Sequence, residues 1–120
     1  MQKNISQHFK RSEFACKCGC GQDTVDYGLV LALETLRNVF GSPVIIGSGN
    51  RCHSYNKKIG GAKNSQHLRG KAADFVVIGV SPAEIYHYLC CVFPHSYGIG
   101  KYRGFTHFDV RDNKSRWSGK

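Results

Sequence analysis

Apolar side chains recur at helical spacing in the stretch that follows Asp26. They are Leu29, Val30, Leu33, Leu36, Val39 and Phe40. This spacing is typical of an amphipathic helix that packs one face against a core. Gly41 and then Pro43 follow the last apolar position, and both residue types end helices. The sequence therefore predicts a core-packing helix that begins at Asp26 and stops at Gly41.

A second helix is predicted after residue 80. Ser81, Pro82 and Glu84 have the residue types and the spacing of a helix N-cap, a first helical position and a capping box. The apolar side chains expected to face inward from this helix are Ile85, Tyr88, Leu89 and Val92. We expect His87 to face solvent and Pro94 to end the helix.

Short apolar or alternating runs predict strands in other parts of the chain. Residues 44–46 and 75–78 are uninterrupted apolar runs, which are typical of buried strands. Residues 106–110 alternate polar and apolar side chains, as a half-buried strand does. Residues 97–102 read as the preceding strand, and the Arg-Gly pair at 103–104 predicts the turn of a β-hairpin.

The remaining segments show neither the helical nor the strand spacing of apolar residues and are predicted as loops. Residues 16–24 are rich in glycine and cysteine, and residues 52–64 are polar, basic and rich in turn-forming residues. Residues 111–120 form a polar and basic tail, in which we expect Trp117 to fold back as an anchor.

The chain length of 120 residues suits one modest core, so we expect a single domain over residues 1–120. Residues 1–13 are expected to form an N-terminal arm pinned by Phe9 and Phe14. No apolar run approaches the roughly 20 residues of a membrane span, so we expect no membrane insertion. The polar N-terminus lacks the apolar segment of a signal peptide, which favours synthesis without a leader.

The net charge of +9, from 17 basic and 8 acidic residues, favours an anionic partner. Nucleic acid, anionic lipid and the anionic polymers of a bacterial wall all fit this charge. We expect no nucleic acid partner, because the basic residues are scattered and no nucleic-acid-binding motif is present.

A histidine and an aspartate flank a run of small residues that leads into the predicted strand at 75–78. His67 is expected on a loop or short turn, and Asp74 at the mouth of the strand. The small residues between them allow the backbone to pass close behind the site. A carboxylate beside a core strand is costly unless it is paired or binds a metal. His67 and Asp74 therefore have the chemistry of two ligands of a zinc site.

A third ligand is available on the predicted strand at 106–110. His107 and Asp109 lie on the same face of this strand, because side chains alternate along it. If this strand pairs with the earlier buried strand, His107 can meet His67 and Asp74. Two histidines and one carboxylate leave a fourth position on zinc open, which is the arrangement of a hydrolase rather than of a structural metal site.

The pattern Ser-x-His-x-x-Gly-x-Ala-x-Asp over residues 65–74 resembles the zinc D-alanyl-D-alanine carboxypeptidase family. That family includes phage endolysins and shares its fold with the Hedgehog signalling domain. Further matches to the family occur in the expected order at residues 48–51, 55–56, 60–62, 98–100 and 107–109. Together these motifs cover most of the chain, and their combination is specific.

The resemblance implies an α+β fold, in which helices pack on a small and mostly antiparallel sheet, and one zinc ion as cofactor. It implies that His67, Asp74 and His107 are the zinc ligands. It also implies that Arg51 binds the carboxylate of the substrate. The implied activity is hydrolysis of peptide bonds in peptidoglycan stem peptides, either as a D-Ala-D-Ala carboxypeptidase or as an endopeptidase. We expect a monomer that acts on the cell wall after release by a phage, with a periplasmic bacterial enzyme as the alternative.

One departure from the family pattern concerns the general base. Many relatives have a glutamate or a histidine shortly before the last zinc ligand, but residues 101–106 contain neither. Asp109 is the nearest carboxylate, and it is either the base or a partner that orients a ligand histidine. Tyr102, His53 and His95 are weaker candidates for the base. The missing acid keeps open the alternative of a non-catalytic zinc-binding domain that recognises a partner.

The chain contains six cysteines: Cys16, Cys18, Cys20, Cys52, Cys90 and Cys91. The chain lacks the paired Cys-x-x-Cys motifs of a zinc ribbon, which argues against a cysteine-only zinc site. We favour reduced structural thiols, because cysteine often serves as a small buried hydrophobe. A disulfide from the first three cysteines to one of the later ones is the alternative.

Overall fold

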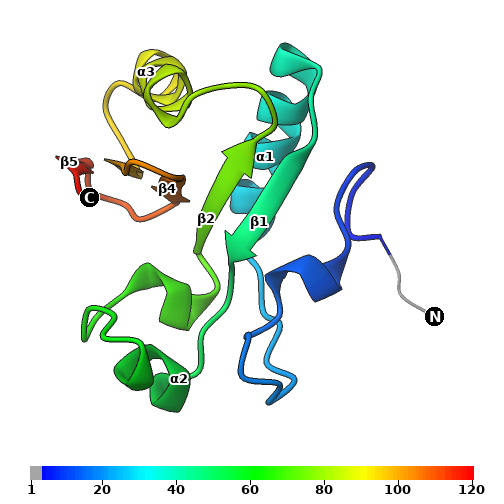
Figure 1. Cartoon of the computed structure of the whole chain (residues 1–120), viewed down its shortest axis with the longest axis vertical. Helices are drawn as coiled ribbons and strands as arrows, with labels where there is room; N and C mark the ends of the chain where they lie inside the picture. Colours follow the sequence, from blue (N-terminus) through cyan, green and yellow to red (C-terminus); the bar gives the residue numbers. More distant parts are fainter. Residues whose placement is uncertain (1–3) are drawn as a thin grey trace.

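The computed structural model describes residues 4–120, which fold around a five-stranded sheet (Figure 1). The strand order in this sheet is β1-β2-β4-β3-β5. The strands are β1 (Val44–Ser48), β2 (Ala72–Val77), β3 (Gly98–Lys101), β4 (Thr106–Asp109) and β5 (Ser115–Ser118). All neighbouring strands are antiparallel except β3 and β5, which are parallel. The predicted α+β class with a mostly antiparallel sheet is therefore confirmed.

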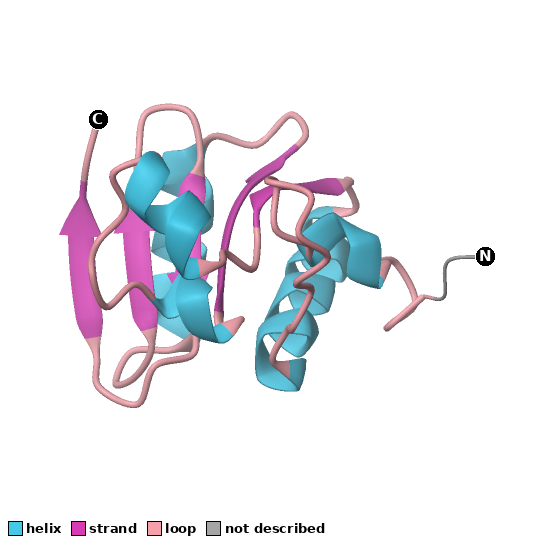
Figure 2. Ribbon diagram, turned by 90° about the horizontal axis from the view of Figure 1, so that it is seen from below, coloured by secondary structure: helices cyan, strands magenta, loops and turns pink. Residues whose placement is uncertain are grey.

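Two longer helices pack on this sheet (Figure 2). Helix α1 (Tyr27–Phe40) packs against β1 and β2, and helix α3 (Pro82–Val92) packs against β2, β3 and β4. The connecting segments contain the short helix α2 (His53–Lys58) and the 3-10 helices η1 (Arg11–Phe14) and η2 (Gln66–Arg69). None of the helices within residues 4–120 has the length and apolar character that a membrane crossing requires.

The local sequence sets both ends of α1 as predicted. Asp26 Oδ1 accepts a hydrogen bond from the backbone N–H of Gly28 at 2.8 Å, which is an N-cap. Gly41 ends the helix with a φ of 63°, a left-handed conformation that glycine adopts at little cost. Val39 differs from the prediction: its side chain is 53% exposed, because it lies at the edge of the apolar stripe.

Helix α3 also begins as predicted, because Ser81 Oγ accepts a hydrogen bond from the backbone N–H of Glu84 at 3.2 Å. Val92 was expected to face inward, but it is 42% exposed. The helix ends at this residue, and the ring of the following Phe93 packs on Phe108 in its place, with the ring centroids 5.6 Å apart.

Three segments differ from the sequence prediction. Strand β2 begins at Ala72 and ends at Val77, so Asp74 lies within the strand and Ile78 lies outside it. Residues 52–64 contain α2, and the tail contains β5, which adds to the edge of β3. Both α2 and β5 are short and polar, so no hydrophobic period marks them in the sequence.

The N-terminal segment is anchored in the core by Phe9 and Phe14, which are both buried. An isolated β-bridge between Asn4 and Lys10 closes the turn that leads to Phe9. Residues 1–3 of the predicted arm lie outside the described residues.

Side chains alternate between the two faces of the sheet, and one face forms the core. Ala73 and Phe108 are paired neighbours on β2 and β4, and both are buried. The cluster that surrounds them includes Phe9, Phe14, Leu29, Leu33, Leu36, Phe75, Ile85, Leu89 and Ile99. Asp74 and His107 are the next pair along, so their side chains point to the opposite face. The core residues thereby fix the register that places a carboxylate beside an imidazole.

Candidate metal centre and substrate cavity

The centre begins with the cross-strand pair of Asp74 on β2 and His107 on β4. His107 Nδ1 lies 2.8 Å from Asp74 Oδ1. The two strands do pair, which was the condition for His107 to meet Asp74, and the pairing brings the two side chains into direct contact. Gly100 is the residue of β3 that faces His107, and its missing side chain leaves the room that Trp117 of β5 fills. The rings of Trp117 and His107 pack with their centroids 5.0 Å apart.

His67 reaches the same centre from the 3-10 helix η2. Ser65 Oγ caps this helix by accepting a hydrogen bond from the backbone N–H of His67 at 3.2 Å. Gly70 ends it with a φ of 69°, and a β-carbon there would also meet the carbonyl oxygen of Thr24 at 2.4 Å. His67 is therefore positioned by a short helix with a cap at each end. The sequence pattern predicted a loop or short turn for this residue, which agrees with this short helix.

The ring of His67 is oriented by a backbone carbonyl. His67 Nδ1 lies 2.7 Å from the carbonyl oxygen of Gly49, so Nδ1 carries the proton and donates it there. The Nε2 atom then presents its lone pair to the centre, 3.3 Å from Asp74 Oδ1. It is buried and has no hydrogen-bond partner among the described residues.

These observations test whether the centre fits a zinc ion. Each of His67, Asp74 and His107 offers one donor atom, and the three atoms all lie within 4.8 Å of one another. An orphaned, buried imidazole nitrogen is costly unless something binds it. Two imidazoles and one carboxylate are also a donor set that zinc accepts in hydrolases. The residues therefore fit the metal, and the fourth side of the set faces a cavity.

The charges of the centre are strongly coupled. Burial would raise the pKa of Asp74, but the hydrogen bond with the imidazole of His107 outweighs burial and holds that pKa well below its usual range. Burial would lower the pKa of His107, but its contacts with Asp109 and Asp74 outweigh burial and raise it. The centre therefore favours an ionised carboxylate with positive charge beside it, which a bound cation also provides.

Asp109 contacts the outer side of His107. Its Oδ2 lies 2.7 Å from His107 Nε2, and its side chain is fully buried. The guanidinium of Arg111 donates to both carboxylate oxygens, from Nε and from Nη2, each at 2.7 Å. Burial alone would raise the pKa of Asp109, but Arg111 and His107 lower it well below its usual range. Both oxygens are thus occupied by protein groups, on the side of His107 away from Asp74.

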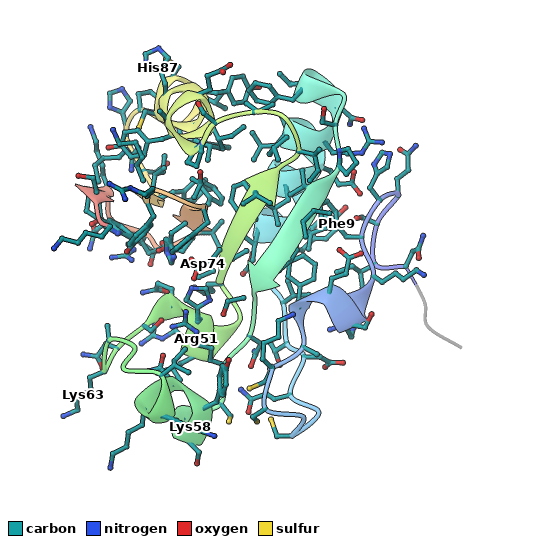
Figure 3. The ribbon with its side chains drawn as sticks, viewed as in Figure 1. Phe9, Arg51, Lys58, Lys63, Asp74 and His87 are labelled. Carbon is teal, nitrogen blue, oxygen red and sulfur yellow. The ribbon has the colours of Figure 1, made fainter. Side chains whose placement is uncertain are left out.

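Arg51 lies beside Asp74, between the sheet and α2 (Figure 3). Its Nη2 lies 3.3 Å from Asp74 Oδ2, its Nη1 donates to Asn56 Oδ1 at 3.1 Å, and its Nε donates to Ser48 Oγ at 3.2 Å. Gly61 allows this packing, because a β-carbon there would lie 2.1 Å from Asn56 Oδ1. A guanidinium has five N–H donors, so each Nη atom keeps one for a ligand.

A cavity of about 680 Å³ lies over the three donors. Its cationic side chains are Arg51, Lys63 and Arg111, and Asp74 is the one carboxylate among its lining residues within 4–120. The rings of Tyr102 and Phe105, which also line it, stack with their centroids 4.4 Å apart. The cavity is therefore electropositive, with an aromatic wall.

A larger hollow of about 1100 Å³ is also lined by Tyr102 and Phe105. No histidine, cysteine or carboxylate is present among its lining residues in the described part of the chain. Of these two hollows, the cavity over the three donors is the one that holds candidate catalytic groups.

The other histidines proposed as bases do not reach this cavity. His53 and His95 are exposed, and neither is among the residues that line it. Tyr102 does line it, and its hydroxyl oxygen accepts a hydrogen bond from Trp117 Nε1 at 2.9 Å. Trp117 folds back onto the sheet as predicted.

Arg111 was missed in the sequence as a residue of the site. The available signal was its spacing, because His107, Asp109 and Arg111 alternate along one face of the chain. Trp117 was expected only as an anchor, and no hydrophobic period indicated that β5 would carry it into the cavity.

Comparison with protein families places the chain among peptidases. A family model described as Peptidase M15 matches residues 7–109, which include Arg51 and the three donor residues. A comparison with curated proteins found no significant match. The matched region spans most of the chain, from the segment before η1 to the end of β4. The chain therefore belongs to the peptidase M15 family, a family of zinc metallopeptidases.

Proposed function

We propose that this protein is a zinc-dependent peptidase that hydrolyses peptide bonds in the stem peptides of bacterial peptidoglycan. The observation that carries the proposal is the orphaned Nε2 of His67, buried beside Asp74 and His107 at the base of an electropositive cavity. Zinc, when bound by His67, Asp74 and His107, supplies Lewis-acid activation of water and of the scissile carbonyl.

Arg51 is proposed to bind the substrate carboxylate. Its guanidinium is held by Ser48, Asn56 and Asp74, so little side-chain entropy remains to be lost when a ligand binds. The N–H that remains on each Nη atom can form a forked pair with a carboxylate. A stem peptide that ends in a free carboxylate supplies this group, which supports carboxypeptidase action over endopeptidase action.

Asp109 is proposed to orient His107 rather than to act as the general base. Both of its oxygens are engaged by His107 and Arg111, and the side chain is fully buried. A histidine that ligates a metal typically donates its other ring N–H to such a carboxylate, which fixes the tautomer and raises the basicity of the ligand atom. Here that arrangement leaves His107 Nδ1 as the ligand atom.

The cell wall is the proposed site of action. Lys63 and Arg111 add positive charge to the cavity around Arg51, and the chain as a whole carries a net charge of +9. Anionic stem peptides and anionic wall polymers would be attracted to this surface. Both a phage endolysin and a periplasmic bacterial enzyme fit these features, and the endolysin is the favoured form.

The proposal is tested by incubating the zinc-loaded protein with purified peptidoglycan and identifying the released products by mass spectrometry. Loss of a terminal D-alanine is the expected product, and it should disappear on treatment with a chelator and return with added zinc. Cleavage within the stem would instead identify an endopeptidase. The His107→Ala variant is the matched inactive control.

A non-catalytic zinc-binding domain is the second candidate. It is favoured by the cavity lining, where Asp74 is the one carboxylate among residues 4–120. Stoichiometric zinc in the wild-type protein without any released product would support this candidate over the peptidase.

A further inference from the structure

Four cysteines gather at one point away from the peptidase centre. The Sγ atoms of Cys16, Cys18, Cys20 and Cys52 all lie within 4.8 Å of one another. Cys16 Sγ is 3.5 Å from Cys18 Sγ, and Cys18 Sγ is 3.6 Å from Cys52 Sγ. A disulfide requires a sulfur–sulfur distance of about 2.05 Å, so these are contacts between separate thiols. The four cysteines are free.

The backbone around the cluster brings these four sulfur atoms toward one another. Gly19 and Gly21 have φ values of 85° and 88°, which let the chain reverse twice within the cysteine-rich loop. A hydrogen bond of 2.7 Å from the Cys16 N–H to the carbonyl of Gln22 closes that loop. The fourth sulfur comes from Cys52, the N-cap of α2.

Two of the sulfur atoms also accept hydrogen bonds from the backbone. The N–H of Cys52 donates to Cys16 Sγ, and the N–H of Tyr55 donates to Cys52 Sγ, both at 3.4 Å. These N–H groups are placed to donate to the sulfur atoms of metal-bound thiolates as well. Two of the four sulfur atoms are thus already held in place by the backbone.

The spacing of the sulfur atoms matches a tetrahedral metal site. Zinc binds thiolates at about 2.3 Å in tetrahedral geometry, which places neighbouring sulfur atoms roughly 3.8 Å apart. The observed sulfur–sulfur distances of 3.5 Å and 3.6 Å are close to this value. We propose that Cys16, Cys18, Cys20 and Cys52 bind a second zinc ion in a closed, structural four-thiolate site.

This site would staple the N-terminal segment to the loop that carries Arg51. Cys52 follows Arg51 directly, and Gln22 Nε2 donates to Asn50 Oδ1 at 2.6 Å and to the Arg51 carbonyl at 3.3 Å. The Asn50 N–H donates to the carbonyl of Phe14 at 2.7 Å. The metal would add a further link between the two segments, and four protein ligands leave no open position on it, so the role of the site is structural rather than chemical.

The proposal departs from the expectation of reduced structural thiols without metal. Three ligands are separated by single residues rather than by the two residues of a zinc knuckle, and the fourth lies on a distant segment. Only the fold brings Cys52 to the other three.

The first test measures the number of zinc ions per chain by elemental mass spectrometry. The protein is purified with zinc under reducing conditions. The wild type should hold two zinc ions per chain, and Cys18→Ser/Cys20→Ser should hold one. His107→Ala should also hold one, and the combined variant none. Cys90→Ser/Cys91→Ser is the matched control and should retain two.

The count separates this proposal from the peptidase centre. A zinc content that Cys18→Ser/Cys20→Ser leaves at the wild-type value overturns the four-cysteine site. A zinc content that His107→Ala leaves unchanged would contradict the peptidase centre instead, without touching the cysteine site.

A second measurement does not depend on the folding of the cysteine variant. Cobalt(II) substituted into the wild-type chain should give the intense thiolate-to-cobalt charge-transfer absorption of a tetrahedral thiolate site. The same absorption should remain in His107→Ala, whose cysteines are intact. Cobalt-loaded wild type without thiolate charge transfer would overturn the proposal.

Discussion

The carboxylate of Asp109 fills the space that Gly98 leaves on the facing strand. Gly98 and Asp109 are paired across β3 and β4, and a β-carbon built on Gly98 would lie 2.5 Å from both carboxylate oxygens. The absence of one side chain thus allows a buried carboxylate to sit against His107, 2.7 Å from its Nε2. The glycine on β3 thereby supports the orientation of a proposed zinc ligand on β4.

A side chain at Gly98 should therefore destabilise the protein. Gly98→Ala forces the Asp109–Arg111 pair to move, because the added carbon would also lie 2.6 Å from Arg111 Nε. Overpacking of this kind costs about 1–3 kcal/mol in the free energy of unfolding, which urea denaturation measures. Gly104→Ala is the matched control, because a β-carbon there meets nothing within 4 Å. Equal stability of the two variants would contradict this account of Gly98.

Asp109→Asn distinguishes an orienting role for Asp109 from a role as general base. The amide keeps the shape of the side chain but loses the charge that faces His107 and Arg111. If Asp109 orients His107, zinc affinity at the peptidase centre should fall by about 10- to 100-fold in a competition assay with a chelator. Asp112→Asn, at an exposed position nearby, is the control and should bind zinc normally. Unchanged zinc affinity with lost activity would make Asp109 the base.

Glu34 should make the stability of the N-terminal segment depend on pH. Glu34 Oε2 accepts hydrogen bonds from Ser6 Oγ and from the backbone N–H of His8, the latter at 2.7 Å. Burial would raise the pKa of Glu34, but these contacts and that of the His8 ring, whose Nδ1 lies 2.6 Å from Glu34 Oε1, outweigh burial and lower it. The carboxylate therefore stabilises the fold above its unfolded pKa of about 4.3, and that stabilisation is lost as the pH falls through the lowered value.

Glu34→Gln should accordingly lower the free energy of unfolding by about 1.5–3 kcal/mol at pH 7, the size of hydrogen bonds to a charged group. The difference from wild type should shrink as the pH falls from about 4.3 through the lowered pKa, because Glu34 is then protonated first in the unfolded and finally in the folded chain. Urea denaturation at pH 7 and again below pH 4 measures this difference in the free energy of unfolding. Glu84→Gln is the control, since glutamine also completes a capping box. A difference that is the same at both pH values would contradict the role of the charge.

The proposed zinc donors could be named from the sequence because strand alternation and the family resemblance pointed to the same residues. Strand alternation places His107 and Asp109 on one face, and the register that brings Asp74 opposite His107 follows from burying the apolar neighbours. The family resemblance then supplied Arg51.

What the sequence left out depends on contacts between distant segments. Alternation could not tell whether Asp109 was free to act as a base, because that depends on Arg111 folding back onto both oxygens. The contact of Trp117 with His107 needs β5, a short polar edge strand without a hydrophobic period. The approach of Cys52 to Cys18 likewise follows from the packing of two loops rather than from a motif.

Arg51→Lys tests whether the cavity recognises a carboxylate. Lysine keeps the charge but loses the fork, together with the bonds that hold the guanidinium to Ser48 and Asn56. The variant should retain zinc and the fold, because Arg51 is not one of the three donors. A charge-assisted pair contributes about 1.5–3 kcal/mol, so activity should fall on the order of ten- to a hundredfold.

The loss should be larger on peptides that end in a free carboxylate than on amidated ones. Arg103→Lys, at an exposed position, is the matched control and should retain activity. Equal loss on free and amidated peptides would mean that Arg51 acts by holding Asp74 in place rather than by binding substrate.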